Sequence, residues 1–143
     1  MSTLRTNALE GVDAKNSITI VAGAGNITTT NVQKGLAKAF CNFDGTSTVS
    51  VRDSQNTASI TDVGTGIYTV NFSNSMANDD YATGLTSRYS GSGAGICLSI
   101  PLDSLVTGNA VQTGSVSTHA TPDYSVSRAD NDICCVTTHG DLA

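Results

Sequence analysis

Short runs of alternating apolar and polar residues fill the chain from Ala39 onward. An alternation with a period of two is typical of β-strands with one buried face. Turn residues rich in Gly, Asn and Asp separate the runs, as in Asp44-Gly45 and Asn78-Asp79-Asp80. Seven or eight such strands predict an all-β fold, an antiparallel β-sandwich or jelly-roll-like body. The runs are AFCNF (39–43), STVSVR (47–52), ASIT (58–61), IYTVNF (67–72), YATGLT (81–86), GICLSIPL (95–102), AVQTGSVS (110–117) and ICCVTTH (133–139).

Two of these runs carry the clearest core residues. In IYTVNF, Tyr68, Val70 and Phe72 share one face of the predicted strand. In STVSVR, Val49 and Val51 share a face in the same way. We therefore expect both faces to be buried in the core.

The segment before the first strand has a different period. In NVQKGLAKA (31–39), Val32, Leu36 and Ala39 recur at the spacing of one helical face. Gly35 interrupts this face and costs about 1 kcal/mol relative to Ala. The pattern predicts at most two turns of helix.

The N-terminal residues are expected to form a separate arm. We assign residues 1–30 to a docking arm and residues 31–143 to the β-sandwich body. SITIV (17–21) predicts a short strand, and AGAGNITTT (22–30) predicts a flexible polar link. The arm is too small for a core of its own, so its apolar residues need a surface on the same subunit or on a neighbour. These residues are Leu4, Leu9, Ile18 and Ile20.

The surface of the body carries few charges. Lys, Arg, Asp and Glu make up 13% of the 143 residues, against about 25% in an average domain. Natural β-proteins protect exposed strand edges with charge or Pro, and this chain has 7 basic residues and 2 prolines. We expect copies of the chain to cover the edges of one another in a homotrimer; the alternative is that loops and short edge strands suffice.

Charge and hydropathy exclude two classes of partner. The net charge is −5 and the basic residues are scattered, so no basic run is present to neutralise phosphates and nucleic acid is not expected. No stretch approaches the roughly 20 apolar residues of a membrane span. The first residues, MSTLRTN, lack the pattern of a secretory signal. We expect a protein that is made in a cytoplasm and does not insert into a membrane.

Four cysteines lie in the predicted strands. Cys134 and Cys135 are adjacent and are expected to point to opposite faces of their strand. Without a secretory signal, buried free thiols are favoured over disulfides. A zinc site is not expected, because no Cys-x-x-Cys pair is present. The four are Cys41, Cys97, Cys134 and Cys135.

No motif indicates catalysis, a cofactor or a metal. His119 and His139 are the only histidines, and no G-x-S-x-G nucleophile motif is present. The glycines between Gly91 and Gly95 lack the spacing of a dinucleotide-binding loop. Asp79-Asp80 and Asp130-Asn131-Asp132 do not follow the pattern of a calcium-binding EF-hand. We expect them to be solvated turn carboxylates, and we expect no catalytic, cofactor or metal site.

Six short motifs follow one another in the first third of the body. They are Ala-Lys-Ala-aromatic, Asn-Phe-Asp, Arg-Asp-Ser, Ile-Thr-Asp, Gly-Thr-Gly and Tyr-Thr-Val-Asn-Phe, and in this order they resemble a module of tail-fibre and other virion proteins of marine and freshwater bacteriophages. SMANDDYAT (75–83) and ICCVTTHGD (133–141) resemble later parts of such proteins. The family commonly has Trp-Val at the position of Phe40-Cys41. The matching positions are Ala37–Phe40, Asn42–Thr46, Arg52–Ser54, Ile60–Asp62, Gly64–Gly66 and Tyr68–Phe72.

Physical roles can also be assigned within this stretch. Gly64 and Gly66 permit positive φ angles in a tight turn, and Asp62 is placed to accept backbone N–H groups of that turn. Arg52 and Asp53 are adjacent and face opposite sides of a strand, so we expect each to pair with a neighbouring strand or subunit.

The resemblance implies a non-enzymatic virion structural protein that is assembled in the bacterial host cytoplasm. It implies a short trimeric tail fibre or fibre-like appendage, which contacts other virion proteins and a glycan or protein of the host surface. The alternatives are a capsid decoration or collar protein without a receptor role, and a carbohydrate-binding module; a depolymerase would need paired carboxylates in a groove. Exposed turn tips on a rigid scaffold are the usual place of recognition. The candidate recognition residues are Asn78, Asp79, Asp80, Gly91, Ser92, Gly93 and Gly95.

Overall fold

The computed structural model describes residues 19–21, 29–31, 35–88, 96–100, 109–122 and 128–143. The chain divides into two compact units, Met1–Leu36 and Ala37–Ala143. The regular elements of the described residues are strands, and every strand pair is antiparallel, which confirms the predicted all-β class. The strands are β1 (Thr19–Val21), β2 (Thr29–Asn31), β3 (Ala39–Asp44), β4 (Ser50–Gln55), β5 (Thr57–Gly64), β6 (Ile67–Phe72), β7 (Ala82–Arg88), β8 (Ile96–Ser99), β9 (Val111–Gln112), β10 (Ser115–Pro122) and β11 (Ile133–His139).

In the first unit, β1 and β2 form an antiparallel pair, with Thr19 opposite Asn31 and Val21 opposite Thr29. The flexible link predicted for residues 22–30 is therefore wrong at its C-terminal end, because the backbone of β2 pairs with β1. Ile20 lies in β1. The other apolar residues of the expected docking arm, Leu4, Leu9 and Ile18, lie outside the described residues.

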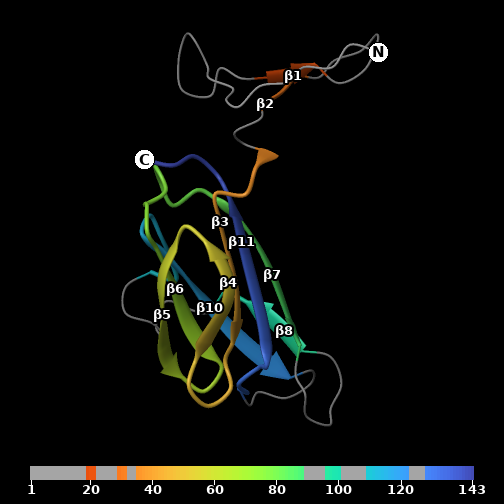
Figure 1. Cartoon of the computed structure of the whole chain (residues 1–143), viewed down its shortest axis with the longest axis vertical. Helices are drawn as coiled ribbons and strands as arrows, with labels where there is room; N and C mark the ends of the chain where they lie inside the picture. Colours follow the sequence, from red (N-terminus) through yellow and green to blue (C-terminus); the bar gives the residue numbers. More distant parts are fainter. Residues whose placement is uncertain (1–18, 22–28, 32–34, 89–95, 101–108, 123–127) are drawn as a thin grey trace. The chain divides into compact units, whose positions relative to one another are not determined.

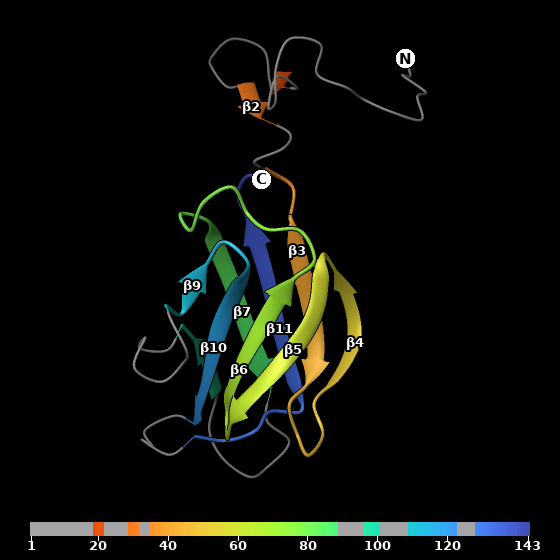
Figure 2. The ribbon, with the colours of Figure 1, turned by 90° about the vertical axis from the view of Figure 1, so that its left-hand side faces the viewer.

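The second unit is the β-sandwich body. Sheet 1 has the strand order β4-β3-β11-β7, and sheet 2 has the order β5-β6-β10-β8, with β9 paired to β10. Figures 1 and 2 show the two sheets as two layers. Because the chain passes from β4 to β5 through the single residue Asn56, these two edge strands bound the same side of the sandwich.

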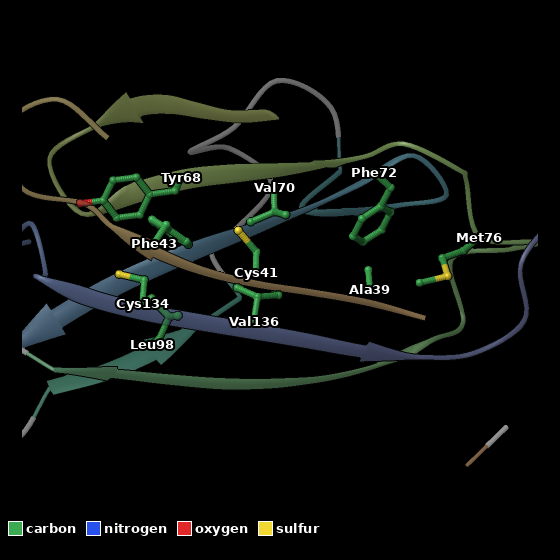
Figure 3. Close-up of a cluster of buried hydrophobic side chains, with 10 residues drawn as sticks. All are labelled: Ala39, Cys41, Phe43, Tyr68, Val70, Phe72, Met76, Leu98, Cys134 and Val136. Carbon is green, nitrogen blue, oxygen red and sulfur yellow. The ribbon is translucent and has the colours of Figure 1, made fainter. Parts of the chain in front are cut away.

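The core lies between the two sheets (Figure 3). Alternate residues of β3 and β11 are buried, and they meet buried residues of β6 and β8. Phe43 packs edge-to-face on Tyr68, with ring centroids 5.2 Å apart. The predicted core face of Tyr68, Val70 and Phe72 is confirmed, since all three side chains are buried. The core cluster is Ala39, Cys41, Phe43, Tyr68, Val70, Phe72, Met76, Leu98, Cys134 and Val136.

The alternating runs locate most strands of the body. The runs 67–72 and 133–139 coincide with β6 and β11. The run 110–117 holds two strands, because a turn at Thr113-Gly114 separates β9 from β10.

Of the helix predicted for residues 31–39, Gly35 is helical, residues 32–34 lie outside the described residues, and the two ends of the range lie in strands. Asn31 ends β2, and Ala39 begins β3. The Lys38 N–H donates to the Thr138 carbonyl at 2.8 Å, so pairing with β11 has already begun at this point. The helical period therefore does not extend to Ala39, because the backbone pairs across the body from Lys38 onward.

Val51 is not a core residue, so the prediction of a buried face formed by Val49 and Val51 is wrong for Val51. The register places Val51 opposite Phe43, which is fully buried, yet the Val51 side chain is 47% exposed. All six residues of β4 are exposed, because β4 is the edge strand of sheet 1. Val49, which lies just before β4, packs against the core as predicted and is partly buried.

The antiparallel strands of the body run between two ends, which we call the junction end and the loop end. At the junction end, β3 begins beside the last residues of β11, and Ala37 joins the body to residues 1–36. The segment between β6 and β7 and the C-terminal residues 141–143 also lie at this end, because the Ala77 N–H donates to the Asp141 carbonyl and the Ala143 N–H to the Ser75 carbonyl. The opposite, loop end carries the β3–β4 and β5–β6 turns.

Candidate recognition surface

The candidate residues Asn78, Asp79 and Asp80 lie in an exposed segment at the junction end. The Asn78 side-chain oxygen accepts the Asp80 N–H at 3.1 Å, which closes a local turn. The residues on either side of this turn are held by the body. The Met76 N–H donates to the Thr113 carbonyl at 2.7 Å, and the Tyr81 hydroxyl lies 2.8 Å from the Ser115 carbonyl. The turn is thus an exposed tip on a fixed base.

The other candidate residues, Gly91, Ser92, Gly93 and Gly95, lie outside the described residues. In the chain they follow β7, whereas Asn78–Asp80 precedes it. β7 has seven residues, and at about 3.4 Å per residue it spans about 20 Å. The chain therefore leaves β7 at the loop end and enters it at the junction end.

A hydrogen-bonded cluster joins three segments at the loop end, and we call it the Tyr68 clasp. The Tyr68 hydroxyl lies 2.9 Å from Asp130 Oδ1 and 3.1 Å from the Gly45 carbonyl. The Gly66 N–H donates to the same Asp130 oxygen at 2.7 Å, and the Gly45 N–H donates to the Asn131 carbonyl at 2.8 Å. The clasp ties the β3–β4 turn, the β5–β6 turn and the segment before β11 to one another.

Glycine is required at two positions of the clasp. A Cβ atom on Gly45 would lie 2.4 Å from the Tyr68 hydroxyl, so only a residue without a side chain permits this approach. Gly66 has a φ of +69°, in the left-handed region that favours glycine. Gly64 also has a positive φ, and the Asp62 side chain accepts its N–H at 3.0 Å. The roles predicted for Gly64, Gly66 and Asp62 in this turn are confirmed.

The prediction that Asp130-Asn131-Asp132 is a solvated turn is wrong. Asp130 accepts two hydrogen bonds in the clasp, Asn131 is fully buried, and Asp132 is paired with Arg88. Both side-chain polar atoms of Asn131 are buried without a hydrogen-bond partner among the described residues. These residues close the loop end instead of projecting into solvent. Sequence reasoning missed the clasp, because Tyr68 and Asp130 are 62 residues apart.

Two ion pairs flank the clasp. Arg52 of β4 pairs with Asp44 of β3 at 2.7 Å, which confirms that Arg52 pairs with a neighbouring strand. Hydrogen bonds from the Thr46 hydroxyl and N–H lower the pKa of Asp44, and the Arg52 charge lowers it further. The hydrogen bond from Arg88 lowers the pKa of Asp132 in the same way. Burial, followed by the hydrogen bond to Asp130, raises the pKa of Tyr68, so this hydroxyl stays protonated and acts as a donor.

The surface of the loop end is polar and mostly uncharged at the tips of its turns. Ser47 and Thr48 are exposed in the β3–β4 turn, and Thr65 and the 43% exposed Val63 lie in or beside the β5–β6 turn. Hydroxyl groups and one apolar side chain are suited to hydrogen bonding and contact with a neutral polar ligand. Because the clasp fixes the base of both turns, these tips stand on a rigid scaffold.

The three cysteines whose side chains are described are free thiols. Cys134 is fully buried and Cys135 is half-buried, which confirms that they point to opposite faces of β11. Burial raises the pKa of Cys41 to about 11 and that of Cys134 to about 12. These two thiols are protonated at neutral pH and belong to the core.

Within the residues that the structure describes, no three His, Cys, Asp or Glu side chains are grouped so that they would hold a metal ion. In the same residues, no helix has the length and apolar character needed to cross a membrane. Comparisons of the chain with protein-family models, with curated proteins and with solved structures gave no match, and the resemblance to virion modules therefore stays a prediction from the sequence.

Proposed function

We propose that the chain is a non-enzymatic structural protein of a bacteriophage virion, a short fibre-like appendage that forms a homotrimer and contacts the host surface. It would be assembled in the cytoplasm of the bacterial host. The observation that carries the proposal is the division of the chain into a small unit, Met1–Leu36, and an all-β body, Ala37–Ala143. An appendage needs one part that attaches to the particle and another that presents loops, and a chain of two units is consistent with this need.

The resemblance supports the same proposal. The matching motifs fall on the consecutive strands β3, β4, β5 and β6 and on the turns between them. Tyr68 and Phe72 of the last motif are core residues, and Gly66 of the Gly-Thr-Gly motif belongs to the clasp. The motifs therefore belong to the scaffold and to the turns at the loop end.

The position of the junction supports the loop end as the part that contacts the host. Ala37 joins the body to the small unit at the junction end. The loop end is the end of the body opposite Ala37, where the chain enters the body. The clasp holds its turns in place, and rigid presentation lowers the entropic cost of binding.

The experiment compares adsorption of virions that carry one substitution each. Thr48→Arg and Thr65→Arg change exposed tips of the loop end, and Asp79→Arg changes an exposed tip of the junction end. We expect the first two to slow adsorption to host cells without changing the melting temperature, while Asp79→Arg has little effect. If only Asp79→Arg slows adsorption, the junction end of the body, and not the loop end, contacts the host. Unchanged adsorption in all three would contradict a receptor role and favour a decoration or collar protein.

A further inference from the structure

The most exposed strand of the body is β4. All six of its residues are exposed, whereas β7, at the opposite edge of sheet 1, alternates between exposed and half-buried residues. β5 is the matching edge strand of sheet 2, and six of its eight residues are exposed. The two strands together form one open side of the sandwich, which we call the β4–β5 side.

Two apolar side chains stand in solvent on this side. Val51 of β4 is 47% exposed although it is opposite the fully buried Phe43, and Val63 of β5 is 43% exposed. Val51 lies near the start of β4 and Val63 near the end of β5, so both are in the half of the body toward the loop end. Apolar side chains in such positions gain stability when a partner covers them.

The charges of β4 complement one another between copies of the chain. Arg52 and Asp53 are both exposed on the same edge strand. Asp53 makes no ion pair with the described residues, and its side chain accepts the N–H of Ser54. Arg52 donates through Nη2 to Asp44, and a guanidinium has five N–H donors, so Arg52 is able to hold a second carboxylate. The alternation that would place Arg52 and Asp53 on opposite faces of β4 is broken by the register shift beside them. A surface with both charges side by side is complementary to itself.

A β-bulge determines how such a contact is made. The register of β4 with β3 shifts between Asn42 and Phe43, so Arg52 has no opposite residue on β3. Bulges twist an edge strand and disfavour the addition of a further strand along its whole length. The contact is therefore made by side chains, with Arg52 and Asp53 at its centre.

We propose that the β4–β5 side is the surface through which copies of this chain contact one another, with Arg52 of one copy paired with Asp53 of the next. This inference rests on the assembly of several copies in the proposed function and names its interface. In a trimer, each copy contributes one Arg52 and one Asp53. Three Arg52–Asp53 pairs between neighbouring copies then close a ring. The pairing also explains why an edge with an exposed Val51 is tolerated, because the neighbouring copy covers it.

The test uses charge reversal in the full chain. Arg52→Asp and Asp53→Arg each place like charges together in the contact, and the double variant restores opposite charges. The dissociation constant of the assembly is measured by sedimentation equilibrium. We expect each single variant to weaken association by roughly tenfold or more, and the double variant to recover most of the loss. Asp79→Arg, at an exposed turn of the junction end, is the matched control and should leave association unchanged.

Folding is followed for each variant by thermal melting. Arg52→Asp also removes the pair with Asp44, and the double variant shares this loss, so recovery in the double variant isolates the contact between copies. Asp53→Arg removes no ion pair within the described residues and tests the contact even if Arg52→Asp fails to fold.

A wild-type chain that stays monomeric at micromolar concentrations overturns the inference. So does a double variant that associates no better than the single variants. The proposed function is tested separately. A chain that assembles through Arg52 and Asp53 but is absent from purified virions would support this interface and contradict the virion role.

Discussion

Tyr68→Phe is expected to lower the stability of the body about twice as much as the same change at Tyr81. Tyr68 is fully buried, Tyr81 is partly buried against the core, and both hydroxyls are hydrogen-bonded. The Tyr68 hydroxyl donates to the carboxylate of Asp130 at 2.9 Å, and a hydrogen bond to a charged group contributes about 1.5–3 kcal/mol. The Tyr81 hydroxyl lies 2.9 Å from the Gln112 carbonyl and 2.8 Å from the Ser115 carbonyl, and a neutral hydrogen bond contributes about 0.5–1.5 kcal/mol.

The assay is urea denaturation of the full chain at one fixed protein concentration, because assembly also shifts the midpoint. Each kcal/mol should also lower the melting temperature by about 4–8 °C for a body of this size. Asp130→Asn and the double variant complete a double-mutant cycle. We expect a coupling energy between Tyr68 and Asp130 of about 1 kcal/mol or more. Strict additivity of the two changes, or a larger loss for Tyr81→Phe than for Tyr68→Phe, would refute the clasp.

The remaining predictions concern the core, the small unit, the assembly and the response to base. Phe72→Ala should cost about 3–5 kcal/mol in the same denaturation assay, because it removes a buried ring and leaves a cavity. Deletion of residues 1–30 should leave a folded body by circular dichroism but abolish incorporation into virions, and normal stoichiometry of the truncated chain in particles would contradict this. Sedimentation equilibrium should show the purified chain as a trimer rather than a monomer. The thiols of Cys41 and Cys134 have pKa values raised from 9.0 to about 11 and about 12, so the folded state holds protons that the unfolded state loses. Their contribution to stability is complete below pH 9 and should decline as the pH rises from 9 toward 12, with melting temperatures recorded across that range as the check.

The alternation along the chain located the strands because each strand of the sandwich has one face on the core. Residues 67–72 and 133–139 show this most clearly, since their buried and less buried positions follow the period of two closely. Asp62 and Gly66 were also recognised from the sequence, because a turn residue acts on its immediate neighbours. The local part of the fold was therefore predictable.

The failures have a common physical cause, which is contact between distant segments. The apolar face of residues 31–39 predicts a helix that extends to Ala39, but the backbone of Ala39 pairs with Thr138 in β11. Val51 has the spacing of a core residue, but its burial depends on a strand of the other sheet that would have to cover β4. The clasp unites Gly45, Tyr68 and Asp130, and no local pattern links an Asp-Gly turn with a tyrosine 23 residues away.

The place of β11 in sheet 1 has a consequence for how the body is made. β11 lies between β3 and β7, yet it is the last strand of the body in chain order. Sheet 1 therefore stays incomplete during synthesis until His139 has left the ribosome, because β3 pairs early with β4 but its second partner lies about 95 residues downstream. Such distant pairing makes folding slow, and the apolar faces of β3 and β6 stay uncovered in the growing chain. A chain that terminates early cannot complete this sheet, so premature products should be removed by proteases before they enter any assembly.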